Sequence, residues 1–348
     1  MVEFLSTLKR VPWLLSRFIA NERKFYPQYD VPPRTRLTLY RNGFFSYAGV
    51  LYDVDRLDEY LSDVEQHRTQ RINGEMGSAL RNKVVASELL SEGFRAHVPE
   101  TIAILSNGSP FSMVGEAMDL DELVDRLPVV CKPIAGGRGR GVSILEGDPA
   151  PRINGRETTE DLIREWLAKR DEYVVVDCVD QHEYAERIFP DAWNSIRIVT
   201  MVDPETREPF IAMAVHRFGT PESAPLDNLS TGGVNARVDV ETGELGPVSS
   251  PLRGSEITWH ESHPTTGERV AGVDVPEWEG VREMVLGIAD RFSHLWQYVG
   301  WDVILSADGI PMVIEGNRAS DVDIMQIHEP LLADPRRRRF YEHHGVVS

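Results

Sequence analysis

Residues 131–142 read CKPIAGGRGRGV, so a lysine at the end of an apolar run is followed closely by four glycines. A backbone this rich in glycine can approach a ligand closely, and its N–H groups often face phosphate oxygens. Lys132 precedes the glycines and a strand-like run, GVSIL, follows them, an order that fits neither a P-loop nor a dinucleotide fingerprint. We therefore expect a glycine-rich hairpin that folds over a triphosphate, with Lys132 as a point charge at its base. A hairpin turn without function is the alternative.

Three polar residues near the other end of the chain could hold a metal ion. Residues 300–317, GWDVILSADGIPMVIEGN, predict a hairpin that turns at Asp308–Gly309. Glu315 and Asn317 are two residues apart and face the same side of a strand, and the turn folds Asp302 back towards them. Magnesium prefers such hard oxygen ligands, and acids on buried strands are costly unless they serve a cation or a partner. The alternative is that these acids lie at exposed strand ends of an acidic protein.

The charge balance of the whole chain narrows the class of partner. The 348 residues carry 55 acids against 37 bases, a net charge of −18. This argues against a general nucleic-acid binder, because phosphate contacts need basic patches. Only five of the bases are lysines, which indicates a halophilic source or a biased genome and makes each lysine more informative. Cys131 and Cys178 lie in strand-like runs and predict buried thiols in a reducing cytoplasm.

The elements that must position these residues indicate an α+β protein with mostly antiparallel sheets. The nearly continuous apolar run EYVVVDCV, at 172–179, predicts a strand that is buried on both faces. The other expected elements are strands at 97–105, 128–134 and 141–145, hairpins at 195–218, 235–246 and 300–317, and helices at 158–170 and 276–296.

The first 75 residues are less clearly patterned. We expect a helix, then a short irregular or β stretch over 37–52, then a polar helix from about Val54 to Arg71, and a second helix over 78–93. Residues 3–24 combine apolar residues at helical spacing with basic ones. This segment could lie on an anionic membrane, dock a partner or pack on its own domain. No run reaches the ~18 apolar residues that a membrane span needs.

Taken in order along the chain, these motifs resemble the ATP-grasp superfamily from about residue 77 to 330. Lys83, in LRNKVVASELLSEGFRAHVPET, resembles its first phosphate lysine and Lys132 its second. The glycine hairpin resembles its flap, YVVVDCVDQHEY its hinge strand, and the acids of the C-terminal hairpin its metal triad. Within the superfamily, residues 182–203 and 229–246 look most like the sugar-transfer-associated group.

The resemblance implies a fold of two α+β lobes with the nucleotide between them. It places a region of unclear fold at 1–75, an N-terminal lobe with the flap at 76–180, and a C-terminal lobe with the metal site at 181–348. The implied cofactors are ATP and Mg²⁺.

The resemblance also assigns roles to individual residues. The Mg²⁺ ligands would be Asp302, Glu315 and Asn317. The catalytic residues would be Lys132 and Arg197, with Arg197 steadying the transferring phosphoryl group. The ATP-binding residues would be Lys83, Lys132, Gly136, Gly137, Arg138, Gly139, Gly141, Asp177, Cys178, Val179, Asp180 and His182. The substrate residues would be Arg197, Thr231, Gly232, Gly233 and Arg318. Two departures stay open: Asp177 stands where Glu or Gln is commoner, and the first 75 residues match no pre-domain of the family. The loop with Thr231 is also explained as a plain turn.

A ligase is the activity that the resemblance implies. A substrate carboxylate would attack the γ-phosphate of ATP, and an amine or thiol would capture the acyl phosphate, with ADP and phosphate released. The expected partners are a small-molecule carboxylate and an amine or other nucleophile, without nucleic acid, in the cytoplasm. Two alternatives stay open: a kinase that phosphorylates a small molecule, and a nucleotide-binding scaffold without activity, against which the intact lysines and acids argue.

Overall fold

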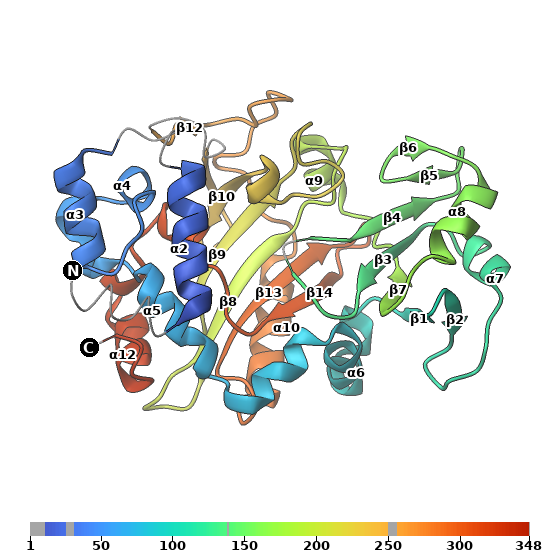
Figure 1. The fold of residues 1–348 in the computed structure, drawn as a ribbon, viewed down its shortest axis with the longest axis horizontal. Helices are drawn as coiled ribbons and strands as arrows, with labels where there is room; N and C mark the ends of the chain where they lie inside the picture. The colour runs from blue at the N-terminus through green and yellow to red at the C-terminus, as the bar shows by residue number, and fades with distance from the viewer. Residues whose placement is uncertain (1–10, 26–30, 138, 250–255, 348) are drawn as a thin grey trace.

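The strands of this protein form two seven-stranded sheets, one from residues 101–177 and one from residues 196–317 (Figure 1). The computed structural model describes residues 11–25, 31–137, 139–249 and 256–347. Every strand pair within the two sheets is antiparallel. The predicted α+β class with antiparallel sheets is therefore confirmed, whereas the predicted lobe boundaries at residues 75 and 180 stay predictions.

The N-terminal sheet has the strand order β2-β1-β7-β3-β4-β5-β6. Its strands are β1 (Thr101–Ser106), β2 (Ser109–Phe111), β3 (Val129–Pro133), β4 (Ser143–Glu146), β5 (Arg152–Ile153), β6 (Arg156–Glu157) and β7 (Tyr173–Asp177), and its helices are α7 (Leu120–Val124) and α8 (Glu160–Leu167). Val129, Cys131 and Val175 pack with residues of both helices in one apolar core. Because side chains alternate along a strand, Lys132 points to the opposite face of this sheet.

The C-terminal sheet has the strand order β12-β11-β10-β9-β8-β13-β14. Its strands are β8 (Ile196–Val202), β9 (Pro209–Phe218), β10 (Val234–Val238), β11 (Leu245–Ser249), β12 (Trp259–His260), β13 (Tyr298–Leu305) and β14 (Pro311–Asn317). One face packs on α10 (Trp278–Arg291), as the helical pattern of that segment predicts. The other packs partly on α11 (Asp323–Gln326) and α12 (Pro335–His343). On that second face, Arg197, Arg217 and Asp302 interrupt the apolar core.

The described part of the N-terminal region is helical, and two predictions about it are wrong. Over 37–52, where a short irregular or β stretch was expected, the structure has the end of one helix, a turn and a short helix. The expected helix from Val54 to Arg71 is three shorter pieces, because Ser62 and Glu65 form a capping box that starts a new helix inside it. The elements are α2 (Pro12–Phe25), α3 (Pro33–Arg41), α4 (Ala48–Leu51), α5 (Asp63–Arg68) and α6 (Lys83–Phe94), α9 (Glu183–Ile188) further on, and 3-10 helices Val54–Glu59, Thr69–Arg71 and Gly74–Arg81.

Of these helices, α3 and α5 lie near α12 at the end of the chain, whereas α6 lies beside α10 (Figure 1). Leu14 of α2 is fully buried in a core with residues of α3 and α4, so this side of the helix packs within the protein. Residues 1–10, which hold part of the segment considered for membrane or partner contact, lie outside the described residues. Among the helices described, none is long and apolar enough to cross a bilayer.

Candidate active site

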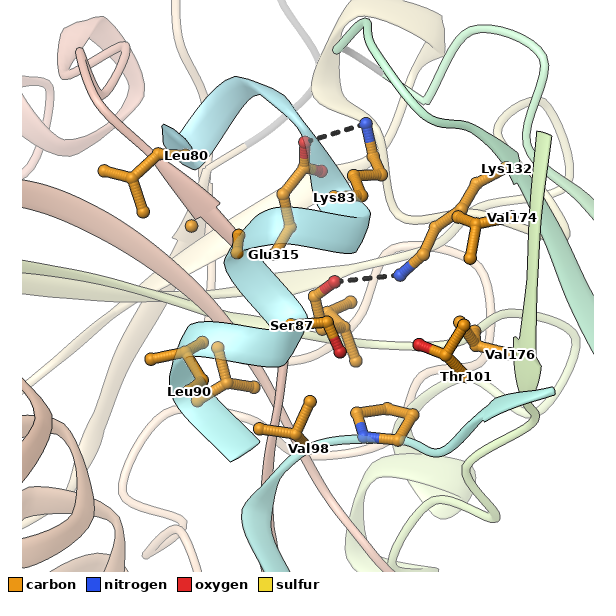
Figure 2. A pocket seen from close by; sticks show the side chains of 15 residues that line it. Leu80, Lys83, Ser87, Leu90, Val98, Thr101, Lys132, Val174, Val176 and Glu315 are labelled. Atoms are coloured by element: carbon orange, nitrogen blue, oxygen red, sulfur yellow. Dashed lines mark hydrogen bonds and ion pairs between the residues drawn. The ribbon is translucent and has the colours of Figure 1, made fainter. Parts of the chain in front are cut away.

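Two lysines from the N-terminal half of the chain meet strand β14 of the C-terminal sheet (Figure 2). Lys83 is the first residue of α6, which begins there because the Asn82 side chain accepts hydrogen bonds from the next two free N–H groups. Its Nζ lies 3.4 Å from Glu315 Oε1 and donates to the Gly136 carbonyl at 3.3 Å. Lys132, on β3, donates to the Ile314 carbonyl at 3.0 Å. Both ammonium groups therefore lie at the junction between the two sheets, against β14.

The Lys132 ammonium is held in a costly environment. Burial lowers its pKa to about 8, although Glu315 raises it; Lys83 lowers it further and Asp302 raises it. A buried cation without a full counter-charge favours anionic ligands, because an anion restores the interactions that the lysine lost with water. Lys132 and Lys83 can thus bind phosphate oxygens.

Between the lysines lies a pocket with an apolar floor. Its lining includes Leu90, Val98, Val174 and Val176, and both lysines and Glu315 stand at its rim (Figure 2). The enclosed volume is about 30 Å³, room for no more than one or two water molecules, so the charged groups at its edge, and not its floor, are what could meet an anion.

The glycine-rich segment joins β3 to β4 as an antiparallel hairpin, as the sequence predicts. Gly136, Gly139 and Gly141 have positive φ angles, which residues with a Cβ rarely adopt. A Cβ at Gly139 would lie 2.2 Å from Asn228 Nδ2, so the tip of this hairpin contacts the loop before β10. A Cβ at Gly137 would meet nothing within 4 Å. Arg138, predicted to bind ATP, lies outside the described residues.

The three predicted metal ligands come together on β13 and β14. Asp302 and Glu315 are register partners, and Asn317 Nδ2 lies 3.5 Å from Asp302 Oδ2. Asp302 is 5% exposed; burial would raise its pKa, but Arg197 and Arg217 outweigh burial and hold that pKa below its usual value. An ionised Asp302 opposite Glu315 is a donor set that fits Mg²⁺. Among the residues that the structure describes, no group of three or more His, Cys, Asp or Glu could hold a metal ion by itself.

The predicted catalytic residue Arg197 is a direct neighbour of that set. It lies opposite Asp302 on β8, and its guanidinium donates to both carboxylate oxygens. It also donates to Ser320 Oγ at 3.3 Å. Arg197 is 9% exposed, and this pair is the main counter-charge that keeps it buried.

Sequence reasoning missed a second buried arginine in the site. Arg217 is on β9, 8% exposed, and its Nη2 lies 3.4 Å from Asp302 Oδ1. It also donates to Ser195 Oγ. The available signal was a charged residue at an inward position of the apolar strand FIAMAVHRF.

The predicted hinge, Asp177 to His182, follows the N-terminal sheet and is tied to the C-terminal one. The Val179 carbonyl accepts from Trp193 Nε1, the Asp180 carbonyl from the Ala307 N–H. His182 caps α9 and donates its own N–H to the Leu305 carbonyl. Several hinge groups thus have structural partners already. The Asp177 side chain is largely exposed to solvent, and partial loss of hydration followed by the nearby Glu100 charge raises its pKa. Cys178 is half-buried and Cys131 fully buried, both as free thiols.

The predicted substrate loop is a tight turn beside the same site. Residues Leu229–Thr231 form a 3-10 turn that ends at Gly232, which has φ +112. A Cβ at Gly233 would lie 2.5 Å from the Asp227 carbonyl oxygen, so the chain crosses itself closely there. Arg318 is half-buried, and the aliphatic part of its side chain lies close to Gly77. Gly77 is far from this turn along the chain.

Comparison with known proteins gives one family match and several distant structural ones. A family model described as sugar-transfer associated ATP-grasp matches residues 66–337. A D-alanine–D-alanine ligase from Coxiella burnetii is 11% identical, with a TM-score of 0.41 over 77% of this chain and 58% of that one. A D-cycloserine synthetase is 12% identical, with a TM-score of 0.44 over 77% and 71%.

A third structural match covers a smaller share of the matched protein. An N5-carboxyaminoimidazole ribonucleotide synthetase in its ADP complex is 12% identical, with a TM-score of 0.40 over 71% of this chain. The chain spans about half the length of that protein, 46% of it. A search of curated proteins finds no match to the chain.

Proposed function

Because this chain belongs to the sugar-transfer-associated ATP-grasp family, we propose that it is an ATP-dependent ligase that joins a small-molecule carboxylate to an amine or thiol. The observation that carries this proposal is the meeting of two lysines with the carboxylate pair on β13 and β14. Lys83 pairs with Glu315, Lys132 lies against the strand that carries it, and Glu315 faces Asp302. Cations and acids at this spacing suit a polyphosphate chain with its metal.

The two lysines would neutralise phosphate oxygens of ATP. The glycine hairpin would cover the β and γ phosphates with its N–H groups and exclude water, which would otherwise hydrolyse an acyl phosphate. Asp302, Glu315 and Asn317 would hold Mg²⁺, which supplies charge neutralisation when it is bound. Arg197 and Arg217 face the same carboxylate and would orient the transferring phosphoryl group.

The reaction proposed here has two steps. An oxygen of the substrate carboxylate attacks the γ-phosphorus, and the bond between that phosphorus and the β–γ bridging oxygen breaks, so ADP leaves. The nucleophile then attacks the acyl carbon, phosphate leaves with the bonding electrons, and the proton of the nucleophile passes to solvent or base. Most of the work of the protein in both steps is positioning and charge compensation.

A hydroxylamine trap tests the proposal. The full chain is incubated with Mg-ATP, hydroxylamine and fractionated small carboxylates, beside a Glu315→Ala variant, and new hydroxamates are sought by mass spectrometry. A hydroxamate with the wild type alone supports acyl-phosphate chemistry and identifies the carboxylate. A phosphorylated metabolite in its place supports a kinase, and untouched ATP across all fractions contradicts both activities.

A further inference from the structure

The loop between β9 and β10 is tied to the start of β8 by one carboxylate. Asp227 is 6% exposed, and its Oδ2 accepts hydrogen bonds from the Ser195 N–H at 2.8 Å and from the Ser195 hydroxyl. Ser195 stands two residues before Arg197. Asp227 therefore sets the distance between this loop and the strand that carries the candidate catalytic arginine.

The same carboxylate also holds Arg217. Asp227 Oδ2 lies 3.4 Å from Arg217 Nε, while Nη2 of that arginine lies 3.4 Å from Asp302 Oδ1. The guanidinium thus stands between two buried acids. With Arg197, the group has two cations and two anions, which is the balance that buried charges need.

Without the Asp227 charge, this balance shifts towards Asp302. Arg217 would then have Asp302 as its remaining carboxylate and would move towards it. That movement would bring a second guanidinium closer to the carboxylate that already accepts from Arg197.

On its other side, Asp227 adjoins the contact with the glycine hairpin. A Cβ at Gly139 would lie 2.2 Å from Asn228 Nδ2 and 3.0 Å from Leu226 Cδ1, so the hairpin tip lies against the residues on either side of Asp227. The hairpin joins strands of the N-terminal sheet and the loop joins strands of the C-terminal sheet. Asp227 lies between this contact and the carboxylate Asp302.

We propose that Asp227 is a positioning residue that seats the loop 226–233 under the closing glycine hairpin and holds Arg217 in register with Asp302. This inference rests on the proposed function, because it assigns the hairpin to nucleotide and Asp302 to the reacting end. Asp227 acts through Arg217 and the loop and does not itself touch the reacting atoms. Its charge, more than its shape, is what the role requires.

Hydrogen–deuterium exchange on the full chain tests the seating of the loop without any turnover. Mg-AMPPNP is the probe, and the variants are Asp227→Asn, which keeps size and loses charge, and the matched control Asp191→Asn, at an exposed acid four residues before Ser195. Nucleotide should slow exchange in residues 134–142 and 226–233 of the wild type and the control. In Asp227→Asn it should slow exchange in 134–142 alone, with a nucleotide Kd within about twofold of the wild type. Equal protection of 226–233 in Asp227→Asn would overturn the inference.

Kinetics of hydroxamate formation test the link to Arg217. Asp227→Asn should lower kcat by about 10–100-fold while the KM for ATP changes little, since misplacement of a reacting group has this size of effect. Arg217→Met and the double variant complete a cycle, and residues that act together should give non-additive losses. Additive losses, or a change in KM alone, would overturn the inference.

The failure of this inference is distinguishable from the failure of the proposed function. If neither the wild type nor any variant exchanges more slowly in 134–142 with Mg-AMPPNP, the nucleotide assignment fails and the inference fails with it. If the wild type is protected and forms hydroxamate but Asp227→Asn behaves like Asp191→Asn, the proposed function stands and the inference alone is overturned. Thermal unfolding of each variant shows whether it is folded, and Asp227→Glu, which restores the charge, should recover part of the kcat.

Discussion

Arg197 on β8 and Asp302 on β13 face each other in register, and the Arg197 guanidinium donates hydrogen bonds to both oxygens of the Asp302 carboxylate. Both residues are buried, and a buried charge that loses its partner is strongly destabilising. A candidate catalytic cation and a candidate metal ligand therefore form one structural unit. Substitution of either will disturb the other, so neither residue by itself can separate the two roles.

Glu315 offers a cleaner test of the metal assignment. Its carboxylate pairs with Lys83 across the junction of the sheets and is partly exposed, so Glu315→Gln removes a charge at little cost in packing. We expect ATP turnover in the hydroxamate assay to fall at least about 100-fold, the usual loss when one electrostatic group of an active site is removed. Glu283→Gln, on the exposed side of α10, is the matched control and should be fully active. Wild-type turnover by Glu315→Gln would contradict the assignment.

The pKa of Lys132 predicts how ATP affinity depends on pH. Burial lowers that pKa to about 8, with Glu315, Lys83 and Asp302 as the charged neighbours. Since only the charged amine attracts phosphate, ATP affinity should fall as pH rises through about 8, by about tenfold per pH unit above it. Isothermal titration with Mg-AMPPNP between pH 7 and pH 9 measures this effect.

Two lysine-to-arginine variants separate Lys132 from other groups that titrate in this range. Lys132→Arg keeps its charge throughout and should flatten the profile, whatever its affinity at pH 7. Lys169→Arg, at an exposed lysine that pairs with Glu165 near α8, should keep the wild-type slope. A slope that survives in Lys132→Arg would assign the titration to another residue.

Gly139 and Gly137 should respond differently to alanine. Gly139 has φ +65, where a Cβ costs about 1–2 kcal/mol, and the added atom would also force Asn228 away from the hairpin tip. Gly137 has neither a positive φ nor a neighbour within 4 Å of an added Cβ. We expect about a tenfold loss of kcat/KM in Gly139→Ala and less than twofold in Gly137→Ala, measured by ADP release in the hydroxamate assay. Equal effects would show that the hairpin does not close in this way.

Much of the candidate site lies within segments whose local pattern is strong. The hairpin over 300–317 brings Asp302 next to Glu315 because strand alternation and a turn at Asp308–Gly309 are both local properties of the sequence. Lys132 and its glycines are similar, since the segment that holds them is a simple two-strand hairpin. Spacing along the chain was enough to predict these arrangements.

The rest of the site depends on the order of strands in the sheets, which local pattern does not determine. Arg217 is on β9 and Asp302 is on β13, and these two strands flank β8 in the sheet. This strand order brings the two side chains close together. The N-terminal region shows a different limit. Capping by Ser62 divides a segment whose polarity alone suggested one helix, and a helical start at Pro33 replaced an expected irregular or β stretch.

Contacts between the N-terminal region and the segment around Asp323 could not be predicted from the sequence either. The Tyr47 hydroxyl lies 2.7 Å from Asp63 Oδ1 and 2.8 Å from Asp323 Oδ2, although Asp323 is far away along the chain. A phenol has one proton and can donate it to one carboxylate, so the other carboxyl must carry a proton and donate it to the Tyr47 oxygen. Burial accordingly raises the pKa of Asp63, to about 6, and also that of Asp323.

The shared proton predicts how replacing Asp63 by asparagine would change the pH dependence of the free energy of unfolding. A carboxyl whose folded pKa is raised stabilises the fold below its unfolded pKa, and the stability is lost as pH rises through the folded value. For Asp63 this window runs from about 4 to about 6. In Asp63→Asn, the amide oxygen can accept a hydrogen bond from the Phe45 N–H. The amide nitrogen can donate a hydrogen bond to the Tyr47 oxygen at every pH in this window, because an amide does not titrate there. The free energy of unfolding of the variant, relative to the wild type, should therefore rise with pH across this window.

The upper limit of that relative rise is about 3 kcal/mol, at about 1.36 kcal/mol per pKa unit. Urea unfolding of both proteins at pH 4, 5, 6 and 7 measures it. The comparison with the wild type matters because His216 and His328, whose pKa values burial lowers to about 3, give the opposite trend in both proteins and cancel in the difference. Asp58→Asn, close by in the sequence but without a shared proton, should show no such rise. A difference between Asp63→Asn and the wild type that is constant from pH 4 to pH 7 would mean that burial does not raise the pKa of Asp63 in the folded protein.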